Sequence, residues 1–323
     1  MPQISVLMTV FNGMPYLKDS IQSVLNQSHT DFQFVIVDDG STDATVAYLD
    51  SLNDPRVTIC RQSNQGTAAA ANQGLKLIDT DFVARMDADD VAMPDRLEKQ
   101  LAFMLNHPAV GIVGSQVAPI GESGVGKSLN LPQTHESIFE TMMAGRHGLA
   151  HSSIMIRTSV LKQLGGYWQL PLIDDWDMML RMGENSELAN LPDVLLNYRV
   201  HSGSLNGSSM WRMHRHISFA IDRAKRRQNG ETEISFKDFE DSLSNRPLRH
   251  RLAEKMHVFA MTHYRLAVAD IHGGRKIKGY ARLVWSAICS PSRTIHRIGR
   301  IFKSKTNSSS NESLKRTIAS NSA

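Results

Sequence analysis

The first two hundred residues alternate between short apolar runs and amphipathic segments. The apolar runs are nearly continuous, which is typical of strands buried on both faces of a sheet. Between them, apolar residues recur at every third or fourth position, as in Tyr16–Gln27, and this spacing predicts helices that pack against the sheet. The predicted strands are Ile4–Val10, Phe32–Val37, Val57–Cys60, Phe82–Ala84, Val110–Val117, His151–Arg157 and Val194–His201.

The order of these elements predicts an α/β fold. Strands that alternate with helices favour a mostly parallel, doubly wound sheet with helices on both faces. From about residue 206 the pattern becomes helical and basic, and Ser304–Ala323 is rich in Ser and Asn. We therefore expect a first domain at 1–205, a basic helical region at 206–303 and a disordered tail at 304–323.

The net charge of +4 conceals an acidic first part and a basic last part. Residues 1–206 carry 13 Lys and Arg against 23 Asp and Glu, whereas residues 207–323 carry 23 against 9. This change of sign indicates two functional units, and the basic unit suits an anionic membrane surface or an acidic acceptor. Nucleic acid is not expected as a partner, because no recognition motif accompanies the positive charge.

Cysteine usage and hydropathy favour a cytoplasmic protein. The chain has only Cys60 and Cys289, which give no disulfide framework and no metal-ligand spacing. The N-terminal segment MPQISVLMTV is interpreted as a first strand, because it lacks the basic residues and the cleavage site of a signal peptide. No apolar run approaches the length of a membrane span.

Three predicted strands end in polar turns. The first is followed by Phe11-Asn12-Gly13, the second by Asp38-Asp39-Gly40, and the strand at Phe82–Ala84 runs into Asp87, Asp89 and Asp90. In doubly wound sheets, ligands bind outside the carboxyl ends of the strands. The three turns are therefore expected to line one crevice.

The acidic turn at Asp87–Asp90 has two interpretations. Asp87 and Asp89 lie on the same side of an extended chain, and their oxygen atoms suit a hard divalent cation that also binds substrate phosphates. The alternative is a solvated acidic turn in which Asp90 or Asp95 caps the helix expected at Arg96–Leu105. The convergence of three polar strand ends favours the cation site.

Two further candidates lie downstream. Asp174 and Asp175 open a predicted helix, where they would either complement the helix dipole or supply a general base. His201 ends the last predicted strand, where it is either structural or a metal ligand near the acidic turn.

Two motifs resemble other sites but have the wrong context. Residues 121–128, GESGVGKS, match a phosphate-binding P-loop letter for letter, yet Pro132 leaves no room for the helix that a P-loop requires. A Gly-rich loop is the favoured interpretation, and a P-loop NTPase is kept as a less favoured alternative. In Asp38-Asp39-Gly40 the acids are adjacent, whereas aspartyl-phosphate enzymes place one residue between them.

Taken together, the motifs resemble those of the family 2 glycosyltransferases, which are nucleotide-sugar enzymes with the GT-A fold. The resemblance extends from Ile4 to about Ser204, nearly two thirds of the chain, and the order of the motifs is more specific than any one of them. One departure is Ala71, which stands where the family usually has Arg; Arg85 or Arg61 could replace that contact. The matching segments are ISVLMTVFN, FVIVDDGSTD, NQGTAAAANQGL, ARMDADD, HSSIMIR, GGY, IDDWDMMLRM and YRVHSGS.

The resemblance implies a role for each matching residue. Thr9, Phe11 and Asp39 would contact the nucleobase, with Asp38 nearby. Asp87 would bind ribose and belong to the coordination shell of the cation. Asp89 would be the direct ligand of Mn²⁺ or Mg²⁺, and His201 would complete the shell. Asp175, beside Asp174, would be the catalytic base, and Gly165-Gly166 would shape the acceptor side. Asn12, Asn64 and Gly66 belong to the motifs implied to bind the nucleotide.

The implied activity is inverting transfer from a nucleotide sugar, in particular a UDP-sugar, to a glycan or lipid-linked acceptor in cell-envelope polysaccharide synthesis. The alternative from another functional class is a catalytically weak member that only binds a nucleotide or glycan. Segment 280–303 carries an apolar stripe with Trp285 between basic residues, and we expect it to face anionic lipid on the cytoplasmic side of the membrane.

Overall fold

The computed structural model describes two compact units, which divide after Glu240. The described residues are 2–121, 124–168, 174–200, 207–272 and 274–289. The predicted tail at 304–323 and the predicted ligand His201 lie outside them. Each unit is described here by itself.

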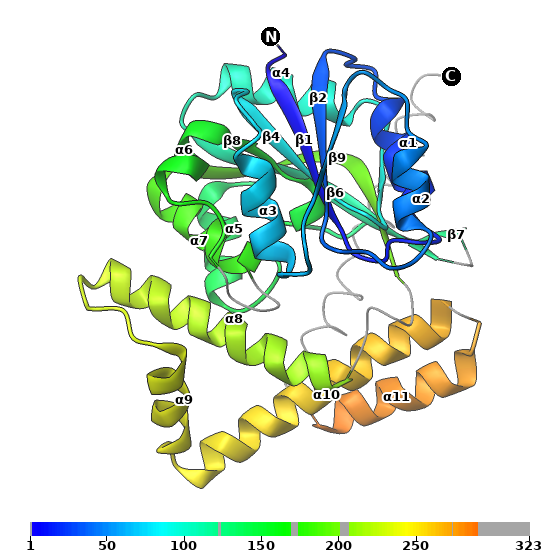
Figure 1. The fold of residues 1–323 in the computed structure, drawn as a ribbon. Helices are drawn as coiled ribbons and strands as arrows, with labels where there is room; N and C mark the ends of the chain where they lie inside the picture. Colours follow the sequence, from blue (N-terminus) through cyan, green and yellow to red (C-terminus); the bar gives the residue numbers. More distant parts are fainter. Residues whose placement is uncertain (1, 122–123, 169–173, 201–206, 273, 290–323) are drawn as a thin grey trace, which may run out of the picture. The chain divides into compact units, whose positions relative to one another are not determined.

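The first unit is built on one sheet, whose strands follow the order β3-β2-β1-β4-β8-β6-β9-β5, with β7 paired to β6 (Figure 1). Strands β1, β2, β3 and β4 are parallel to one another, and β6 is parallel to β9. The bounds are β1 Ile4–Val10, β2 Phe32–Asp38, β3 Val57–Arg61, β4 Phe82–Asp87, β5 Val91–Ala92, β6 Val110–Gly121, β7 Gly124–Val125, β8 Met155–Arg157 and β9 Glu187–Arg199.

The second half of the sheet is mixed. Strand β8 is antiparallel to both β4 and β6, and β5 is antiparallel to β9. The strand predicted at His151–Arg157 is wrong for its first four residues. His151–Ser153 form the short 3-10 helix η1, and the strand begins only at Met155. The predicted α/β class is confirmed, with this antiparallel insertion at its centre.

Helices cover both faces of the sheet, and each face has its own hydrophobic core. One core joins the strands to α1 (Leu17–Leu25), α2 (Thr45–Asp50) and α4 (Arg96–Asn106). The other joins them to α3 (Thr67–Leu75), α5 (His135–Met143), α6 (Thr158–Gln163) and α7 (Asp174–Asn185). Figure 1 shows α1 and α2 on the opposite side of the sheet from α3.

Alternation along the strands supplies both cores and explains the continuous apolar runs. In β1, Val6 and Met8 face the first core while Leu7 faces the second. Full burial of one such side chain stabilises the fold by about 1.5–3 kcal/mol. The same alternation holds in β4, where Phe82 belongs to the first core and Val83 to the second. Arg85 and Asp87 therefore lie on the second face.

The first compact unit extends beyond residue 205, where the charge changes sign, because α8 (Gly207–Gln228) packs against α7. The contact contains a buried ionic network. Asp177 of α7 receives hydrogen bonds from Arg181 at 2.7 Å and from Arg223 of α8 at 3.3 Å. Arg223 also donates to Glu233 at 2.6 Å. The predicted domain at 1–205 stays a prediction, but these contacts join α8 to α7 within the first unit.

The second unit is a pair of packed helices that follows the end of α9 (Phe236–Ser244). Helices α10 (Leu248–His272) and α11 (Lys276–Cys289) lie against each other along most of α11. They approach closely at Gly279, where a side-chain carbon would lie 2.5 Å from Ile271. Among the described residues, no helix has the length and apolar character needed to cross a membrane.

The network around Arg223 predicts a pH-dependent contribution to stability. Burial alone would raise the pKa of Glu233, but hydrogen bonds from Arg223 and Arg227 lower it overall. A carboxylate with a lowered pKa stabilises the fold above its unfolded pKa, and this contribution is lost as pH falls through the folded pKa. Glu233→Gln should therefore reduce the free energy of unfolding by about 1 kcal/mol at pH 7 in urea titrations.

The difference between Glu233→Gln and the wild type should shrink as the pH falls through the lowered folded pKa of Glu233, because the protonated Glu233 side chain is then neutral like Gln. Glu140→Gln is the matched control, since Glu140 is exposed on α5, and it should cost little across the same pH range. An unchanged free energy of unfolding for Glu233→Gln at pH 7 would show that the ion pair contributes nothing.

Candidate active site

A cavity of about 430 Å³ lies at the carboxyl edge of the parallel strands, where the sequence predicted a shared crevice. The register of the sheet produces it, because Thr9 of β1 lies opposite Val37 of β2 on one side and Asp87 of β4 on the other. Six predicted site residues line this cavity together: Thr9, Phe11, Asp39, Asp87, Asp89 and Asp175. The remaining lining residues are Val10, Thr67, Ala70, Ala88 and His151.

Asp39 fixes one wall of the cavity. It is buried, and its carboxylate accepts hydrogen bonds from Gln62 Nε2 at 2.7 Å, Gln65 N at 2.9 Å and Gly66 N at 2.8 Å. One oxygen accepts two of these bonds and the other accepts one, so Oδ2 retains acceptor capacity for a ligand N–H. Phe11 stands at the rim with 51% of its surface exposed, where an aromatic base could stack on it.

Four predicted nucleotide-binding residues do not line the cavity. Asp38 is buried and accepts the backbone N–H of Ser41 at 2.9 Å. Asn12 accepts the backbone N–H of Thr42 at 2.8 Å, which ties the first polar turn to the second. Asn64 is exposed, and Gly66 begins α3 and donates to Asp39. These residues shape the turns around the cavity.

The acidic turn is held by hydrogen bonds from three other elements. Ser152 of η1 accepts the backbone N–H of Asp87 at 3.0 Å, and Ser20 of α1 donates to the carbonyl of Asp90 at 2.6 Å. Arg199 of β9 donates its backbone N–H to the Asp90 carboxylate and its Nε to the Asp89 carbonyl, both at 2.8 Å. The end of β9 therefore lies against the acidic turn, two residues before His201.

Burial and mutual repulsion perturb these acids. Asp90 is only 6% exposed, and burial together with Asp87 and Asp89 raises its pKa to about 8. The pKa of Asp87 is also raised, because burial and Asp89 outweigh the opposing effect of Arg85 and Arg96. Asp87 and Asp89 line the cavity, whereas Asp90 points to Arg199 and does not.

Arg85 is the arginine that pairs with Asp87, which lines the cavity. Its guanidinium is fully buried, donates to the carbonyl of Leu7 at 3.1 Å and lies 3.7 Å from Asp87. Its Nε has no hydrogen-bond partner among the described residues. Ala71 is fully buried in the core, and Arg61 pairs with Asp50 at 2.5 Å. Of the two arginines considered as substitutes at position 71, Arg85 is therefore the one beside the cavity.

His151 is a lining residue that sequence reasoning missed. Its Nδ1 lies 4.0 Å from Asp87, and its Nε2 lies 3.2 Å from the hydroxyl of Tyr167. Burial and the nearby Arg85 hold the pKa of His151 well below its usual value, so the ring is neutral at pH 7. His151 reaches the cavity because β8 is antiparallel, so the residues before this strand lie at the edge where the parallel strands end.

A polar clamp joins α3 to the loop before α7. The Asn72 amide donates to the carbonyl of Tyr167 at 2.6 Å and accepts its backbone N–H at 2.9 Å. Gly165 and Gly166 precede Tyr167 with φ of 80° and 71°, a conformation that L side chains rarely adopt. The predicted acceptor-side loop is thus fixed against the motif NQG at 72–74.

Asp175 occupies the first turn of α7 and lines the cavity together with Asp87 and Asp89. Its Oδ1 accepts the backbone N–H of Trp176 at 2.7 Å, as a residue at a helix N-terminus can. Asp174 begins the same helix, and its side chain lies outside the described residues. Asp175 therefore lies at a helix N-terminus and lines the cavity at the same time, and its role as a base stays a prediction.

The carboxylates suit a cation that is shared with a ligand. Within the described ranges, no three His, Cys, Asp or Glu side chains form a complete metal site. Asp87 and Asp89 offer carboxylate oxygens to one cavity, and the Asp87 side chain is 40% exposed. Mg²⁺-type cations are commonly held by one or two carboxylates together with substrate phosphates. The residues present fit such a cation.

The P-loop alternative is wrong. Ile120 pairs with Val125 across the β6–β7 hairpin, and Gly126 donates its N–H to the carbonyl of Pro119 at 2.7 Å. The chain after Ser128 is not helical, and α5 begins only at His135. Lys127 is exposed next to this hairpin. The predicted Gly-rich loop is confirmed for the described part of the segment.

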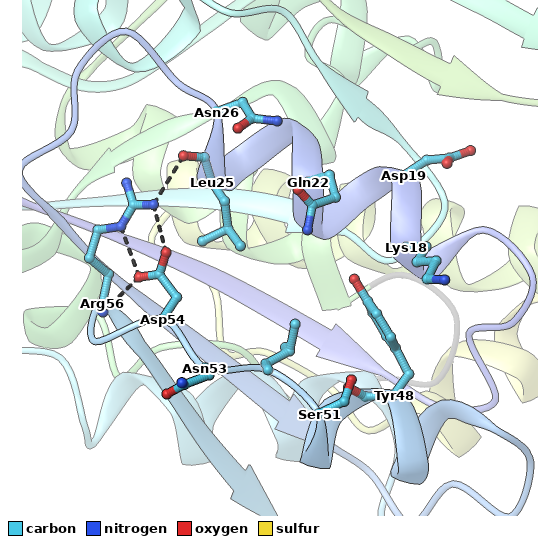
Figure 2. Close-up of a pocket in the computed structure, with 11 residues that line it drawn as sticks. Lys18, Asp19, Gln22, Leu25, Asn26, Tyr48, Ser51, Asn53, Asp54 and Arg56 are labelled. Carbon is cyan, nitrogen blue, oxygen red and sulfur yellow. Dashed lines mark hydrogen bonds and ion pairs between the residues drawn. The ribbon is translucent and has the colours of Figure 1, made fainter.

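A larger cavity, of about 620 Å³, lies between α1 and the segment 48–56 (Figure 2). Figure 2 shows that the Arg56 guanidinium is bound to Asp54 and to the carbonyl of Leu25. The hydrogen bond from Arg56 lowers the pKa of Asp54, so both charges are already compensated. None of the predicted site residues lines this cavity, so its greater volume does not make it the active site.

Comparisons with known proteins show that the sequence is similar to glycosyltransferases. The profile described as Glycosyl transferase family 2 matches residues 5–165. The O-antigen biosynthesis glycosyltransferase WbnJ of Escherichia coli is 33% identical over 215 residues, covering 64% of this chain and 83% of WbnJ. The amylovoran biosynthesis glycosyltransferase AmsE of Erwinia amylovora is 30% identical over 213 residues, covering 64% of this chain and 80% of AmsE.

Solved structures share the fold. S. aureus TarS 1–349 in complex with UDP-GlcNAc aligns with a TM-score of 0.56 at 17% identity, covering 91% of this chain and 92% of that chain. The mannosyltransferase PcManGT from Pyrobaculum calidifontis, in complex with GDP-Man and Mn²⁺, aligns with a TM-score of 0.54 at 16% identity. It covers 93% of this chain and 80% of that chain. These similarities confirm the GT-A fold class.

The polar clamp can be tested with two neighbouring glycines. Gly165→Ala meets no neighbouring atom and should cost only the backbone penalty of a positive φ, about 1–2 kcal/mol. Gly166→Ala pays the same penalty and also places a carbon 2.5 Å from the Asn72 amide oxygen. The second variant should therefore lose about 1–2 kcal/mol more in urea unfolding, because the hydrogen bonds to Tyr167 are displaced.

The substitution Asn72→Ala removes the partner of this clamp. In an Asn72→Ala background, the two glycine variants should become nearly equal in stability. Equal losses for the two glycine variants in the wild-type background would contradict the clamp.

Proposed function

The chain belongs to glycosyl transferase family 2, and we propose on that premise that it transfers a sugar from a nucleotide sugar to a glycan or lipid-linked acceptor with inversion. The observation that carries this proposal is the shared cavity. It joins the acids that end β2 and β4 to Asp175, the one candidate base on α7 whose side chain is described.

The nucleotide would lie over the ends of β1 and β2. Phe11 would stack on the base, and the remaining acceptor capacity of Asp39 would receive a ring N–H. Uracil has such a donor, and we propose a UDP-sugar as the donor substrate. The aligned TarS structures contain UDP or UDP-GlcNAc and that of PcManGT contains GDP-Man, so the fold itself accommodates more than one base.

Asp89 would be the direct ligand of Mn²⁺ or Mg²⁺, with Asp87 and His201 in its shell. When bound, such a cation neutralises the charge that grows on the departing diphosphate. The chain itself holds the acidic turn in place through Ser152 and Arg199. Arg85 lies behind Asp87 and offsets part of the charge of the cluster before ligands arrive.

Asp175 would act as the general base. The acceptor hydroxyl must lose a proton as its oxygen attacks the anomeric carbon, and a carboxylate on the acceptor side can take that proton. It lies in the first turn of α7, and its side chain lines the same cavity as Asp87 and Asp89. One base and a single attack from the side opposite the diphosphate give inversion, and Asp174 would support Asp175 from the preceding position.

The descriptions of the relatives indicate only the general type of acceptor. WbnJ and AmsE are described as biosynthesis glycosyltransferases for O-antigen and amylovoran. We propose by analogy a role in cell-envelope polysaccharide synthesis, with the protein peripheral on the cytoplasmic face of the membrane. The alternative, a member that binds a nucleotide or glycan without turnover, would share the cavity but would lack the function of Asp175.

Asp175→Asn tests the base. With Mn²⁺ and a panel of UDP-sugars, the wild type should release UDP, and Asp175→Asn should lower kcat by about 10²–10⁴. The KM for the donor should change little, because the base contacts the acceptor. Asp193→Asn is the control, since Asp193 pairs with Lys99 at the surface. Metal-dependent UDP binding without turnover on any donor would favour the binding module.

Asp89 and Asp90 provide a matched pair at the acidic turn. Asp89→Asn should abolish the Mn²⁺ dependence of UDP binding in calorimetry, because a direct ligand is lost. Asp90→Asn should retain most of the binding, since an amide oxygen can still accept the backbone N–H of Arg199. Equal losses in the two variants would contradict the proposed division of roles.

A further inference from the structure

The outer face of α11 carries an exposed row of large apolar side chains, which we call the α11 stripe. Its central members are Ile277, Val284 and Ile288, with exposed fractions of 89%, 59% and 63%. Tyr280 and Trp285 flank them with exposed fractions of 59% and 57%. Solvent-exposed apolar residues are normal when scattered, but a continuous row on one helix marks a binding surface.

Helix geometry places the stripe on the side of α11 that faces away from α10. Gly279 packs against Ala267 and Ile271 of α10, and Ser286 donates to the carbonyl of Ala260 at 2.8 Å. At 100° per residue, Ile277, Val284 and Ile288 lie about 140–180° around the helix from Gly279. The pairing with α10 therefore leaves the stripe uncovered within the second unit.

The charges on α11 itself have one sign. Lys276 and Lys278 are exposed and lie on either side of the stripe. The last acid before α11 in the sequence is Asp270, which is buried and pairs with Arg275 at 2.8 Å and with Arg282 at 2.5 Å. By sequence alone, residues 271–311 contain nine Lys and Arg and no Asp or Glu. The apolar face is thus bordered by Lys residues, and α11 itself carries no acid.

We propose that the α11 stripe binds the interface of a membrane that contains anionic lipids. An apolar helix face with Trp and Tyr at its flanks and Lys at its border matches the interfacial region, where rings lie at headgroup level and ammonium groups meet lipid phosphates. The 14 residues of α11 extend about 21 Å, so the helix would lie in the plane of the interface.

Other occupants fit less well. A second copy of the chain would bring the same cations against one another, and like charges across an interface are unfavourable. Nucleic acid would use the cations but would leave the Ile and Val side chains without an apolar partner. The membrane satisfies both the apolar stripe and the cations.

This inference deepens the proposed function, because it names the surface that would hold the enzyme where lipid-linked acceptors are found. Only this benefit for catalysis rests on the proposed function; membrane binding itself is argued from the α11 stripe. Membrane binding and sugar transfer are measured separately: UDP release with a soluble acceptor requires no vesicles, and flotation requires no donor. Failure of one would therefore be distinguishable from failure of the other.

Vesicle flotation with the full-length chain tests the proposal. Vesicles of phosphatidylcholine with about 30% phosphatidylglycerol should carry the wild type upward, and pure phosphatidylcholine vesicles should carry much less, because anionic headgroups attract the Lys residues. The double variant Val284→Asp/Ile288→Asp should bind at least about tenfold more weakly, since two apolar side chains can no longer be buried. Added salt should weaken the wild type.

The matched control is Val125→Asp, because Val125 is 64% exposed in the β6–β7 hairpin of the first unit. It should float like the wild type, and circular dichroism should confirm that all variants are folded. Equal flotation of the double variant and the wild type would overturn the proposal. The proposal would also be overturned if the wild type did not float and formed a dimer that the double variant Val284→Asp/Ile288→Asp converts to a monomer. The stripe would then bind a second copy of the chain.

Discussion

Three carboxylates at the end of a buried strand are the constraint on which the first unit depends. Asp87 ends β4 and Asp89 and Asp90 follow it. A buried carboxylate is costly unless hydrogen bonds and cations compensate it. Two arginines from different strands compensate the negative charge of this turn. Arg85 lies behind Asp87, and Arg199 donates to both Asp89 and Asp90. The arrangement leaves Asp87 and Asp89 facing the cavity, where a cation and a diphosphate would complete the balance of charge.

The architecture of the sheet assembles the rest of the site. Parallel strands bring the polar ends of β1, β2 and β4 to one edge, and antiparallel β8 adds His151 to the same edge. The clamp between Asn72 and Tyr167 then fixes the loop that leads to α7 and Asp175. The ionic network around Asp177 holds α7 against α8. Residues far apart in the sequence are thereby positioned around one cavity.

Much of this was predictable from the sequence because the information is local. Continuous apolar runs fixed the strands, and polar residues at the ends of these runs identified Asp39, Asp87 and Asp89, whereas Thr9 was named only through the family resemblance. What could not be predicted depends on tertiary contacts. His151 was missed because rules for parallel strands do not apply to β8. The two-residue strand β5 is too short to give a pattern. Charge predicts a boundary at residue 205, whereas the packing of α8 against α7, which extends the first compact unit to Glu240, leaves no pattern in the sequence.

A crystal structure with UDP and Mn²⁺ would decide whether the acidic turn holds the cation and the nucleotide. We expect an anomalous manganese peak beside Asp89 and next to the diphosphate, with the base between Phe11 and Asp39 in the cavity at the carboxyl edge of the sheet. This expectation would be contradicted by a nucleotide bound in the larger cavity near Arg56, or by manganese bound away from Asp87 and Asp89.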